Sequence, residues 1–269
     1  MVEPVEGGRR DRVVTRLKHA LPLLITVTVI ILVWEFFGKI TGEPEYVLPP
    51  LHKILITAVD RSLDKLLPAT SVTVQEIMAG FALGTIVGFL LGVATFHVET
   101  LRRAIMPLVI ASQAVPVLAI APILVIWFGF GIEPKIIVAG LIVFFPVTIN
   151  TMAGLGAVER DVINLMNSLD ATPRQVFFKV RFPAALPAIF TGLKNAAVIS
   201  VIGAIVGEWV GSDAGLGPVM IAANSAFKTD LVFAAILYLA VIGVSLFLAV
   251  SLAERKLIAW HFLTRNPRG

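Results

Sequence analysis

The sequence predicts an all-α membrane protein in which six membrane-spanning helices form one bundle. Of its 269 residues, 57% are hydrophobic and 15% are charged, whereas a soluble domain carries about 25% charged residues. A helix needs about 20 mostly apolar residues to cross a bilayer, and six runs of roughly this kind follow one another along the chain. They cover residues 21–37, 78–97, 104–132, 136–158, 182–210 and 231–253.

Charges between the apolar runs give the orientation of the helices. Fifteen Lys and Arg residues fall in the two tails and in the second and fourth loops, and six fall in the other three loops. Because positively charged loops stay in the cytoplasm, both termini are expected there. The sequence thus predicts a multi-pass protein of the bacterial inner (plasma) membrane, in contact with membrane lipid.

The predicted organisation is a basic N-terminal tail (1–20), one transmembrane domain (21–253) and a short C-terminal tail (254–269). No small-residue cleavage site follows Phe37, so the first apolar run is expected to remain as a span and not to be removed as a signal peptide. The segment 41–74 is placed outside the membrane. Its residues 52–67 have the apolar spacing of an amphipathic helix, which favours a helix lying on the membrane surface over a platform for an external protein.

Composition excludes several functional classes. The chain has no cysteine, which rules out disulfides, thiolate catalysis and Cys-ligated metals. Its four histidines are scattered, so no metal site is expected. The net charge is only +4, and the basic residues lie between apolar runs and not on one face, so no nucleic-acid partner is expected. The chain contains no phosphate-binding P-loop. No cofactor is therefore expected on this chain, and any ATP must be bound by a partner.

Small and polar residues within the spans are candidates for packing or for a transport path. Gly80, Gly84, Gly88 and Gly92 lie on one helix stripe, which favours close packing against another helix. In the third run, Pro116 breaks the helical hydrogen bonding next to Ser112 and Gln113, which is consistent equally with a helix that faces a cavity and with a simple kink.

Two charges interrupt the fifth run. Lys194 and Glu208 are fourteen residues apart, about 21 Å along a helix, so they cannot pair within it. A charge inside a membrane normally faces a cavity or a partner. A pathway or gating role is favoured for Glu208, while Lys194 is expected to extend toward the membrane surface. Asn195 is a further candidate for lining a path.

The cytoplasmic loop 159–183 has the strongest local pattern. Its first half has apolar residues at helical spacing, and Thr172, Pro173 and Gln175 then form a capping box that predicts a second short helix. Phe182-Pro183 is expected to end that helix. The spacing alone does not distinguish an amphipathic hairpin on the lipid surface from a helix that enters a groove on a partner. The candidate contact residues are Leu165, Met166, Leu169, Asp170, Ala171, Thr172, Pro173, Gln175, Val176 and Phe177.

Residues 164–183 resemble the cytoplasmic signature of binding-protein-dependent importer permeases. That signature is Glu-Ala-Ala, three residues, Gly, nine residues, an aliphatic residue, one more residue and Leu-Pro. The spacing is kept here, but the opening triplet, the Gly and the Leu are replaced. Asp170 occupies the Gly position, and Asp is one of the few residues other than Gly that tolerate a left-handed turn. The resemblance favours the partner interpretation of the loop.

Further motifs are similar to the nitrate/sulfonate/taurine/bicarbonate permease family, in residues 119–122, 127–131, 144–146, 183–187 and 207–217. The resemblance implies the six-span fold of type I ABC importer permeases with a cytoplasmic coupling helix. It also implies two ATP-binding ABC subunits, a second permease subunit, expected to be a copy of this chain, and an external solute-binding protein.

Residues 112–113 and 207–211 look most similar to the branch that imports thiamine-pyrimidine precursors or riboflavin. The implied substrate is a pyrimidine-like or riboflavin-like heterocycle, or a nitrate-like or sulfonate-like anion. The alternative function is a secondary transporter driven by an ion gradient, which the charges of the fifth run suggest. No internal repeat between the two halves supports it, and no cluster of His, Asp or Glu supports a membrane enzyme.

Overall fold

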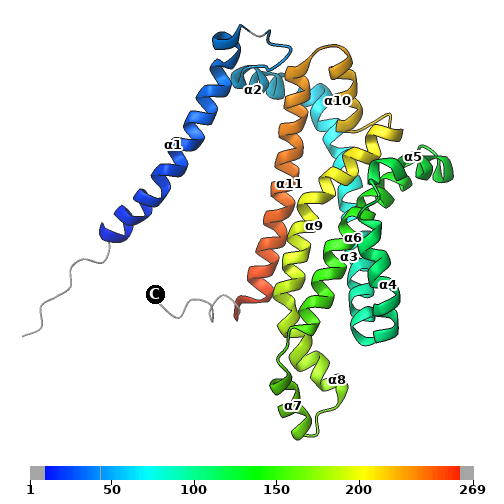
Figure 1. Ribbon diagram of the computed structural model, residues 1–269. Coiled ribbons are helices and arrows are strands. Elements are labelled where there is room, and N and C mark those ends of the chain that lie inside the picture. The colour runs from blue at the N-terminus through cyan, green and yellow to red at the C-terminus, as the bar shows by residue number, and fades with distance from the viewer. Residues whose placement is uncertain (1–9, 43, 261–269) are drawn as a thin grey trace, which may run out of the picture.

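The computed structural model describes residues 10–42 and 44–260, and in that part of the chain every regular element is a helix. The bundle is built around α6 (Glu133–Gly156), which packs along α3 (Leu67–His97) on one side and α9 (Phe182–Gly211) on the other. The fourth long helix, α11 (Thr229–Leu257), packs against α9. These helices run roughly side by side (Figure 1).

Glycines bring the backbones of the three central helices together. A Cβ atom on Gly84 of α3 would lie 2.5 Å from the carbonyl oxygen of Gly140 in α6, and one on Gly88 would lie 2.7 Å from that of Phe144. On the other side of α6, a Cβ atom on Gly203 of α9 would lie 2.6 Å from the Cα of Ala139. The close approach predicted from the glycine stripe is confirmed, because any larger side chain would push these backbones apart.

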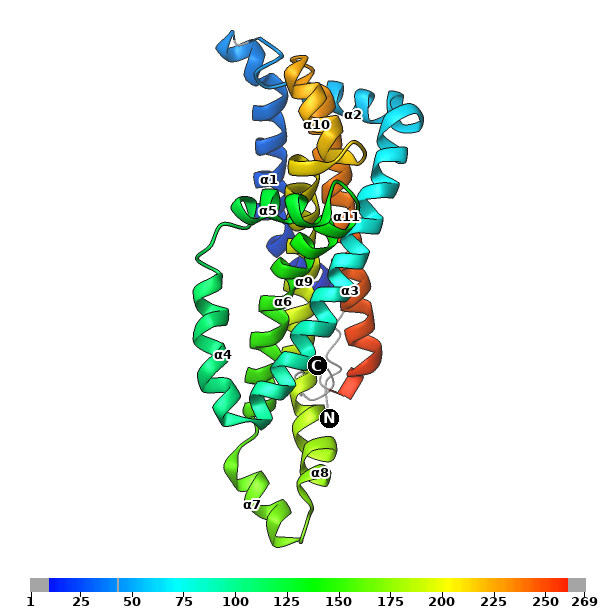
Figure 2. The same ribbon diagram turned by 90° about the vertical axis from the view of Figure 1, so that its right-hand side faces the viewer.

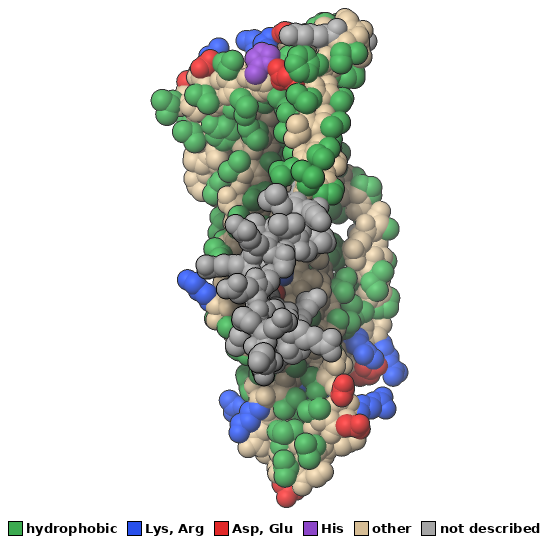
Figure 3. All heavy atoms as spheres, turned by 90° about the vertical axis from the view of Figure 1, so that its left-hand side faces the viewer, with side chains coloured by type: hydrophobic (Ala, Val, Ile, Leu, Met, Phe, Trp, Pro, Cys, Tyr) green, Lys and Arg blue, Asp and Glu red, His purple; other side chains and the backbone are tan. Residues whose placement is uncertain are grey.

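Within the described residues, four helices are long and apolar enough to cross a membrane: Ser62–His97, Glu133–Gly156, Pro173–Gly211 and Thr229–Leu257. They contain the predicted spans 78–97, 182–210 and 231–253. They also contain the predicted span 136–158 except for its last two residues. Of two shorter apolar helical stretches, Leu24–Gly38 overlaps the predicted span 21–37 and ends one residue beyond it, and Val117–Phe128 falls within the predicted span 104–132. On the face shown in Figure 3, hydrophobic side chains cover the flanks and charged ones gather toward the two ends.

The predicted span 104–132 is divided into two helices, α4 (Glu99–Ser112) and α5 (Val117–Phe128). Pro107 and Pro122 remain inside helices, whereas Pro116 stands at the N-cap of α5 with an extended backbone (φ −61°, ψ 117°). The break lies here because Pro116 has no N–H to donate and its ring disfavours helical geometry at the residue before it. Figure 2 shows α4 and α5 joined by this non-helical stretch.

At the end of the bundle opposite the loop 159–183, α1 (Arg10–Thr41) meets the bundle through its last turns and stands apart from it elsewhere (Figure 1). Trp34 donates to the carbonyl of Pro49 at 3.1 Å and its ring meets Phe233 edge-on. The helix begins at Arg10, inside the predicted tail 1–20. Residues 1–9 of that tail, and 261–269 of the C-terminal one, lie outside the described part of the chain.

The amphipathic segment predicted at 52–67 is helical and packs onto the bundle. It forms α2 (Leu51–Asp60) and a π-helical turn (Ser62–Leu66) that leads into α3. Ile54 and Ala58 are buried, and the hydroxyl of Tyr238 in α11 donates to the Ala58 carbonyl at 3.2 Å. Short helix α10 (Leu216–Ser225) lies beside it, between α9 and α11.

The loop 159–183 contains α7 (Arg160–Ser168) and α8 (Pro173–Val176) and extends beyond the end of the bundle (Figures 1 and 2). The prediction that Phe182-Pro183 ends the second helix is wrong. A π-helical turn, Phe177–Arg181, joins α8 to α9, so that Pro173–Gly211 is one continuous helix. The wider π turn contains Lys179, the residue whose carbonyl the ring of Pro183 would otherwise meet, and so the helix passes the proline.

Candidate functional site

The turn of the loop 159–183 has the conformation that its sequence predicts. Asp170 lies in the left-handed region (φ 54°). Its N–H bonds to the carbonyl of Asn167 at 3.1 Å, and the next N–H, of Ala171, bonds to Met166 at 3.1 Å. These two bonds form a Schellman motif at the end of α7. Asp170 therefore performs the structural role of the glycine that this position usually holds.

The second helix of the loop begins at the predicted capping box. Thr172 Oγ1 accepts the N–H of Gln175 at 3.3 Å, and Gln175 Oε1 accepts the N–H of Thr172 at 2.8 Å. Pro173 occupies the first turn of the helix. The N–H groups there have no partner within the helix, so the missing N–H of proline costs no hydrogen bond. Two consecutive local motifs thus fix the angle between α7 and α8.

The loop exposes large apolar side chains on α7 and on the π turn that follows α8. Leu165 is 61% exposed, Leu169 is 70% exposed and Phe178 is 57% exposed. None of the residues of α7 is buried, although their apolar spacing is that of a helix with one buried face. The guanidinium of Arg174 lies 5.9 Å from the centre of the Phe178 ring. Within the described chain, this surface has no covering element.

The base of the same loop packs against the bundle. Val176 is buried, and the ring of Phe177 lies 4.8 Å from that of His97 at the end of α3. Arg181 donates to the carbonyl of Leu155 in α6 at 3.1 Å and lies 5.0 Å from the centre of the Phe96 ring. Of the ten predicted contact residues, Val176 and Phe177 thus face the bundle, and the other eight are exposed or half-exposed.

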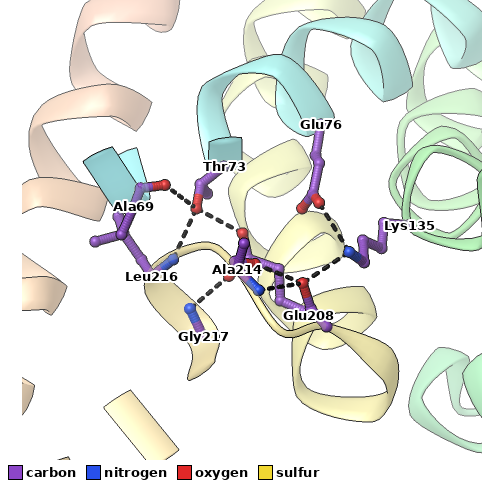
Figure 4. A network of polar contacts seen from close by, with 9 residues as sticks. Ala69, Thr73, Glu76, Lys135, Glu208, Ala214, Leu216 and Gly217 are labelled. Atoms are coloured by element: carbon purple, nitrogen blue, oxygen red, sulfur yellow. Dashed lines mark hydrogen bonds and ion pairs between the residues drawn. The ribbon is translucent and has the colours of Figure 1, made fainter. Parts of the chain in front are cut away.

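A buried polar network lies at the opposite end of the bundle (Figure 4). The Glu208 side chain, 1% exposed, accepts the hydroxyl of Thr73 at 2.5 Å and the N–H of Gly217. The Thr73 oxygen accepts the N–H of Leu216 at 2.9 Å. The carboxylate of α9 and the hydroxyl of α3 therefore satisfy the first two N–H groups of α10.

The network continues to α6 through an ion pair. Lys135 Nζ lies 3.3 Å from Glu76 Oε1 and donates to Ser212 Oγ at 2.7 Å. Glu76 is fully buried, and neither of its oxygens accepts a hydrogen bond from the described residues. Buried charges of this kind need a partner, and Lys135 is the one present here. The network joins α3, α6, α9 and the loop that leads to α10.

Sequence reasoning identified only Glu208 among these residues. It placed Thr73, Glu76 and Lys135 in external loops, because each lies just outside an apolar run. One signal was available for Glu76, which precedes Gly80 by four residues and so continues the glycine stripe back by one turn. Glu208 itself is enclosed by the chain and does not lie on an exposed face.

The other charge of the fifth run also has a partner. Lys194 Nζ lies 2.8 Å from Glu254 Oε2, near the C-terminal end of α11. This pair connects α9 to α11 across sixty residues of sequence. Lys194 and Glu208, which suggested an ion-driven transporter, thus both take part in contacts between helices.

The remaining path candidates do not form one cluster. Gln113 and Pro116 are exposed at the break between α4 and α5, and Asn195 is exposed on α9, one turn from Thr191 and Val198. The side chain of Ser112 lies outside the described part of the structure. Within the described residues, no group of three or more His, Asp or Glu side chains could hold a metal ion.

Comparison with known proteins gives relatives along nearly the whole chain. Residues 84–259 match the family described as binding-protein-dependent transport system inner membrane component. The formylaminopyrimidine transport permease protein ThiX of Halalkalibacterium halodurans is 37% identical over 243 residues, which cover 90% of this chain and 97% of that protein.

Two further relatives have different names. The riboflavin transport system permease protein RibX of Chloroflexus aurantiacus is 34% identical and aligns with 90% of this chain and 91% of its own length. The taurine transport system permease protein TauC of Escherichia coli is 31% identical and aligns with 88% of each chain.

The fold also has a solved counterpart. A chain of the MetNI methionine ABC transporter, in an inward-facing conformation, superposes with a TM-score of 0.63 at 17% identity and covers 71% of this chain and 95% of its own. This likeness concerns the fold alone. The family match and the relatives together show that the chain belongs to the family of binding-protein-dependent transport system inner membrane components, as a permease subunit of an ABC importer in the inner membrane.

Proposed function

We propose that the loop 159–183 is the coupling element of this permease and receives the movement of a separate ATPase. The observation that carries the proposal is the exposed apolar surface of Leu165, Leu169 and Phe178, on a segment that continues directly into α9. At 1.5 Å per residue, the 39 residues of Pro173–Gly211 extend over roughly 58 Å, about twice the hydrocarbon thickness of a bilayer. The loop therefore projects beyond the membrane.

The proposed contact surface differs in part from the one that spacing suggested. Val176 and Phe177 attach the loop to the ends of α3 and α9, and the exposed residues from Leu165 to Gln175, with Phe178, meet the partner. A short helix in a groove buries its apolar side chains in the partner's pocket. ATP is bound by that partner, since this chain has no P-loop.

The topology proposed for this function has six spans. The four long helices account for four of them, α1 supplies another, and α4 with α5 supplies the last in two pieces. Basic residues in the tails and in the loops at the α7 end support a topology with both termini in the cytoplasm. The outer end is then the one that carries α2 and α10.

A second copy of this chain completes the proposed path. One face of α9 is exposed along its length at Thr191, Asn195, Val198 and Ile202, and these positions follow helical spacing on a single stripe. The path is proposed to run between the two α9 stripes, with Gln113 and Asn195 as polar contacts for the solute. Glu208 is buried away from this stripe.

An external solute-binding protein is the proposed partner on the outer side. Two adjoining hollows of about 300 and 390 Å³ lie between the end of α2 and the α10–α11 turn, and Lys65, Lys228 and Leu231 line both. A surface that combines charged and apolar groups in this way is typical of the contact region of a protein partner. The proposed substrate is a pyrimidine-like or riboflavin-like heterocycle, in line with the names of two relatives. The second candidate is a nitrate-like or sulfonate-like anion, because another relative is named as a taurine transport permease.

Substitution of the exposed loop residues tests the coupling proposal. Leu169→Asp or Phe178→Asp places a charge on the contact surface, and we expect the amount of co-purified ATPase to fall at least tenfold, because a desolvated charge at an interface is costly. The matched control is Asn164→Asp, which places the same charge at an exposed position of α7 on the side of the helix away from Leu165 and Leu169. Affinity purification from membranes, with the permease and the ATPase encoded beside it produced together, provides the measurement.

Two outcomes would contradict the proposal. If the intact wild-type permease never retains an ATPase, the coupling proposal is wrong. If both Asp variants retain as much ATPase as the wild type, the contact surface has been assigned to the wrong residues. The alternative, a transporter driven by an ion gradient, predicts that uptake into vesicles depends on the ion gradient and not on ATP. Uptake of formylaminopyrimidine, riboflavin or taurine would then persist without ATP and would be lost with the ion gradient.

A further inference from the structure

The N-terminus of α10 is capped by residues from two other helices. Its own N-cap, Gly215, has no side chain and a positive φ of 114°. A helix leaves its first N–H groups without partners, and here Glu208 and Thr73 accept those of Gly217 and Leu216. A carboxylate is well placed there, because the helix dipole is positive at the N-terminus.

Glycine makes room for this contact. A Cβ atom on Gly217 would lie 2.7 Å from the Cβ of Glu208, and one on Gly215 would overlap its carboxylate. Gly215 also needs the positive φ that glycine adopts without strain. The loop between α9 and α10 is therefore shaped around the Glu208 side chain.

The rest of α10 is packed onto the same outer core. Leu216 and Ala223 are buried together with Ala58 of α2, Ile205 of α9 and Leu231 of α11. The opposite side of α10, including Ile221 and Ser225, is exposed at the outer end. A displacement of α9 would thus also move the exposed side of α10, because α10 is attached through the buried cap at its N-terminus and through its packing against this core.

We propose that Glu208 and Thr73 are positioning residues that make α10 a rigid extension of α9, so that movement of the coupling loop is carried to the outer surface of the permease. Glu208 lies three residues before the end of a helix that is continuous from Pro173. The Lys135–Ser212 bond fixes the start of the connecting loop on α6. This inference rests on the proposed coupling role of the loop 159–183.

Single cysteines provide the test, because the natural chain has none. Ala223→Cys reports whether α10 stays packed, and Ser225→Cys reports its exposed side. Both are labelled with a membrane-impermeant maleimide in the complex with its ATPase in nanodiscs, without nucleotide and after trapping with ATP and vanadate. Each reporter is combined with Glu208→Ala, Glu208→Gln, Thr73→Val or the control Glu133→Ala, an exposed carboxylate near the same end.

With wild-type Glu208, we expect slow labelling of Ala223→Cys and a labelling rate of Ser225→Cys that differs at least threefold between the two nucleotide states. Glu208→Ala and Thr73→Val should raise Ala223→Cys labelling at least fivefold and remove the nucleotide response of Ser225→Cys. Glu208→Gln, whose amide oxygen still accepts the Gly217 N–H, should restore part of both. Glu133→Ala should change neither.

Three results would overturn the proposal: no nucleotide response at Ser225→Cys with wild-type Glu208, unchanged Ala223→Cys labelling in both Glu208→Ala and Thr73→Val, or a nucleotide response that survives when α10 is released. Failure of the proposed function is recognised separately, because no ATPase would then remain in the purified complex. The labelling of Ala223→Cys without nucleotide needs no ATPase and still tests the contact.

Discussion

At the scale of single residues, Asp170 shows how a departure from a family pattern can keep its geometry. The left-handed conformation costs most residues about 1–2 kcal/mol, and Asp and Asn tolerate it better than others. The Schellman bonds to Asn167 and Met166 are complete with Asp in place. The departure from glycine therefore leaves the turn between α7 and α8 intact.

This turn gives a prediction for substitutions at position 170. Asp170→Gly should retain the ATPase in co-purification at the wild-type amount, because glycine adopts the positive φ freely. Asp170→Val should lower that amount at least fivefold, since a β-branched residue is an outlier at positive φ. Equal co-purification by the Gly and Val variants would show that the angle between α7 and α8 does not matter for the partner.

The buried carboxylates mark the limit of residue-level prediction. Capping of α8 and the turn at Asp170 depend on residues within five positions of one another, so the sequence predicts both. Thr73, the side-chain partner of Glu208, lies 135 residues away, and Glu254, the partner of Lys194, lies 60 residues away. Hydropathy gives no information about such distant pairs. Lys135 and Glu76 also lie at the edges of apolar runs, where a charge is normally assigned to water.

At the scale of elements, hydropathy located the four long helices because their length and apolar content are properties of the local sequence. It did not show that α8 continues into α9, since a π turn at Phe177–Arg181 carries the helix past Pro183. Three prolines interrupted the run 104–132, and only Pro116 breaks the helix. Tertiary packing decides which proline a helix accommodates, and the local sequence pattern does not show that packing.

The packing of α3 on α6 gives a prediction at this scale. Gly84→Ala should destabilise the protein by about 1–3 kcal/mol, because the added methyl group meets the Gly140 carbonyl and overpacking has costs of this order. Gly156→Ala is the matched control, since a Cβ atom there meets nothing within 4 Å. Thermal unfolding in detergent measures both variants.

The two alanine variants separate packing from helix propensity. Alanine favours a helix over glycine by about 1 kcal/mol, so Gly156→Ala should unfold at the wild-type temperature or slightly above it. Gly84→Ala should unfold several degrees lower. Equal unfolding temperatures for the two variants would mean that the backbones of α3 and α6 are not held in close contact.

At the scale of the whole molecule, the two candidate regions lie at opposite ends of α9. At one end, the base of the loop 159–183 joins α3, α6 and α9 through Phe177 and Arg181. The Glu208 network joins the opposite ends of the same helices. Between the two, glycine contacts bring α6 close to both neighbours. Polar contacts at both ends and close packing between them favour movement of these helices as one body.

Transmission across the membrane requires that these ends lie on opposite sides of it. We expect Ser225→Cys to react with an impermeant maleimide in intact spheroplasts, and Ser168→Cys to react only in inside-out vesicles. Both serines are exposed, and both substitutions exchange the same atoms, so the pair differs only in location. The basic tails and the basic loop around α7 are the physical reason, because positively charged loops remain in the cytoplasm. Labelling of Ser168→Cys in sealed spheroplasts would reverse the orientation and would leave the exposed apolar surface of α7 without access to a cytoplasmic ATPase.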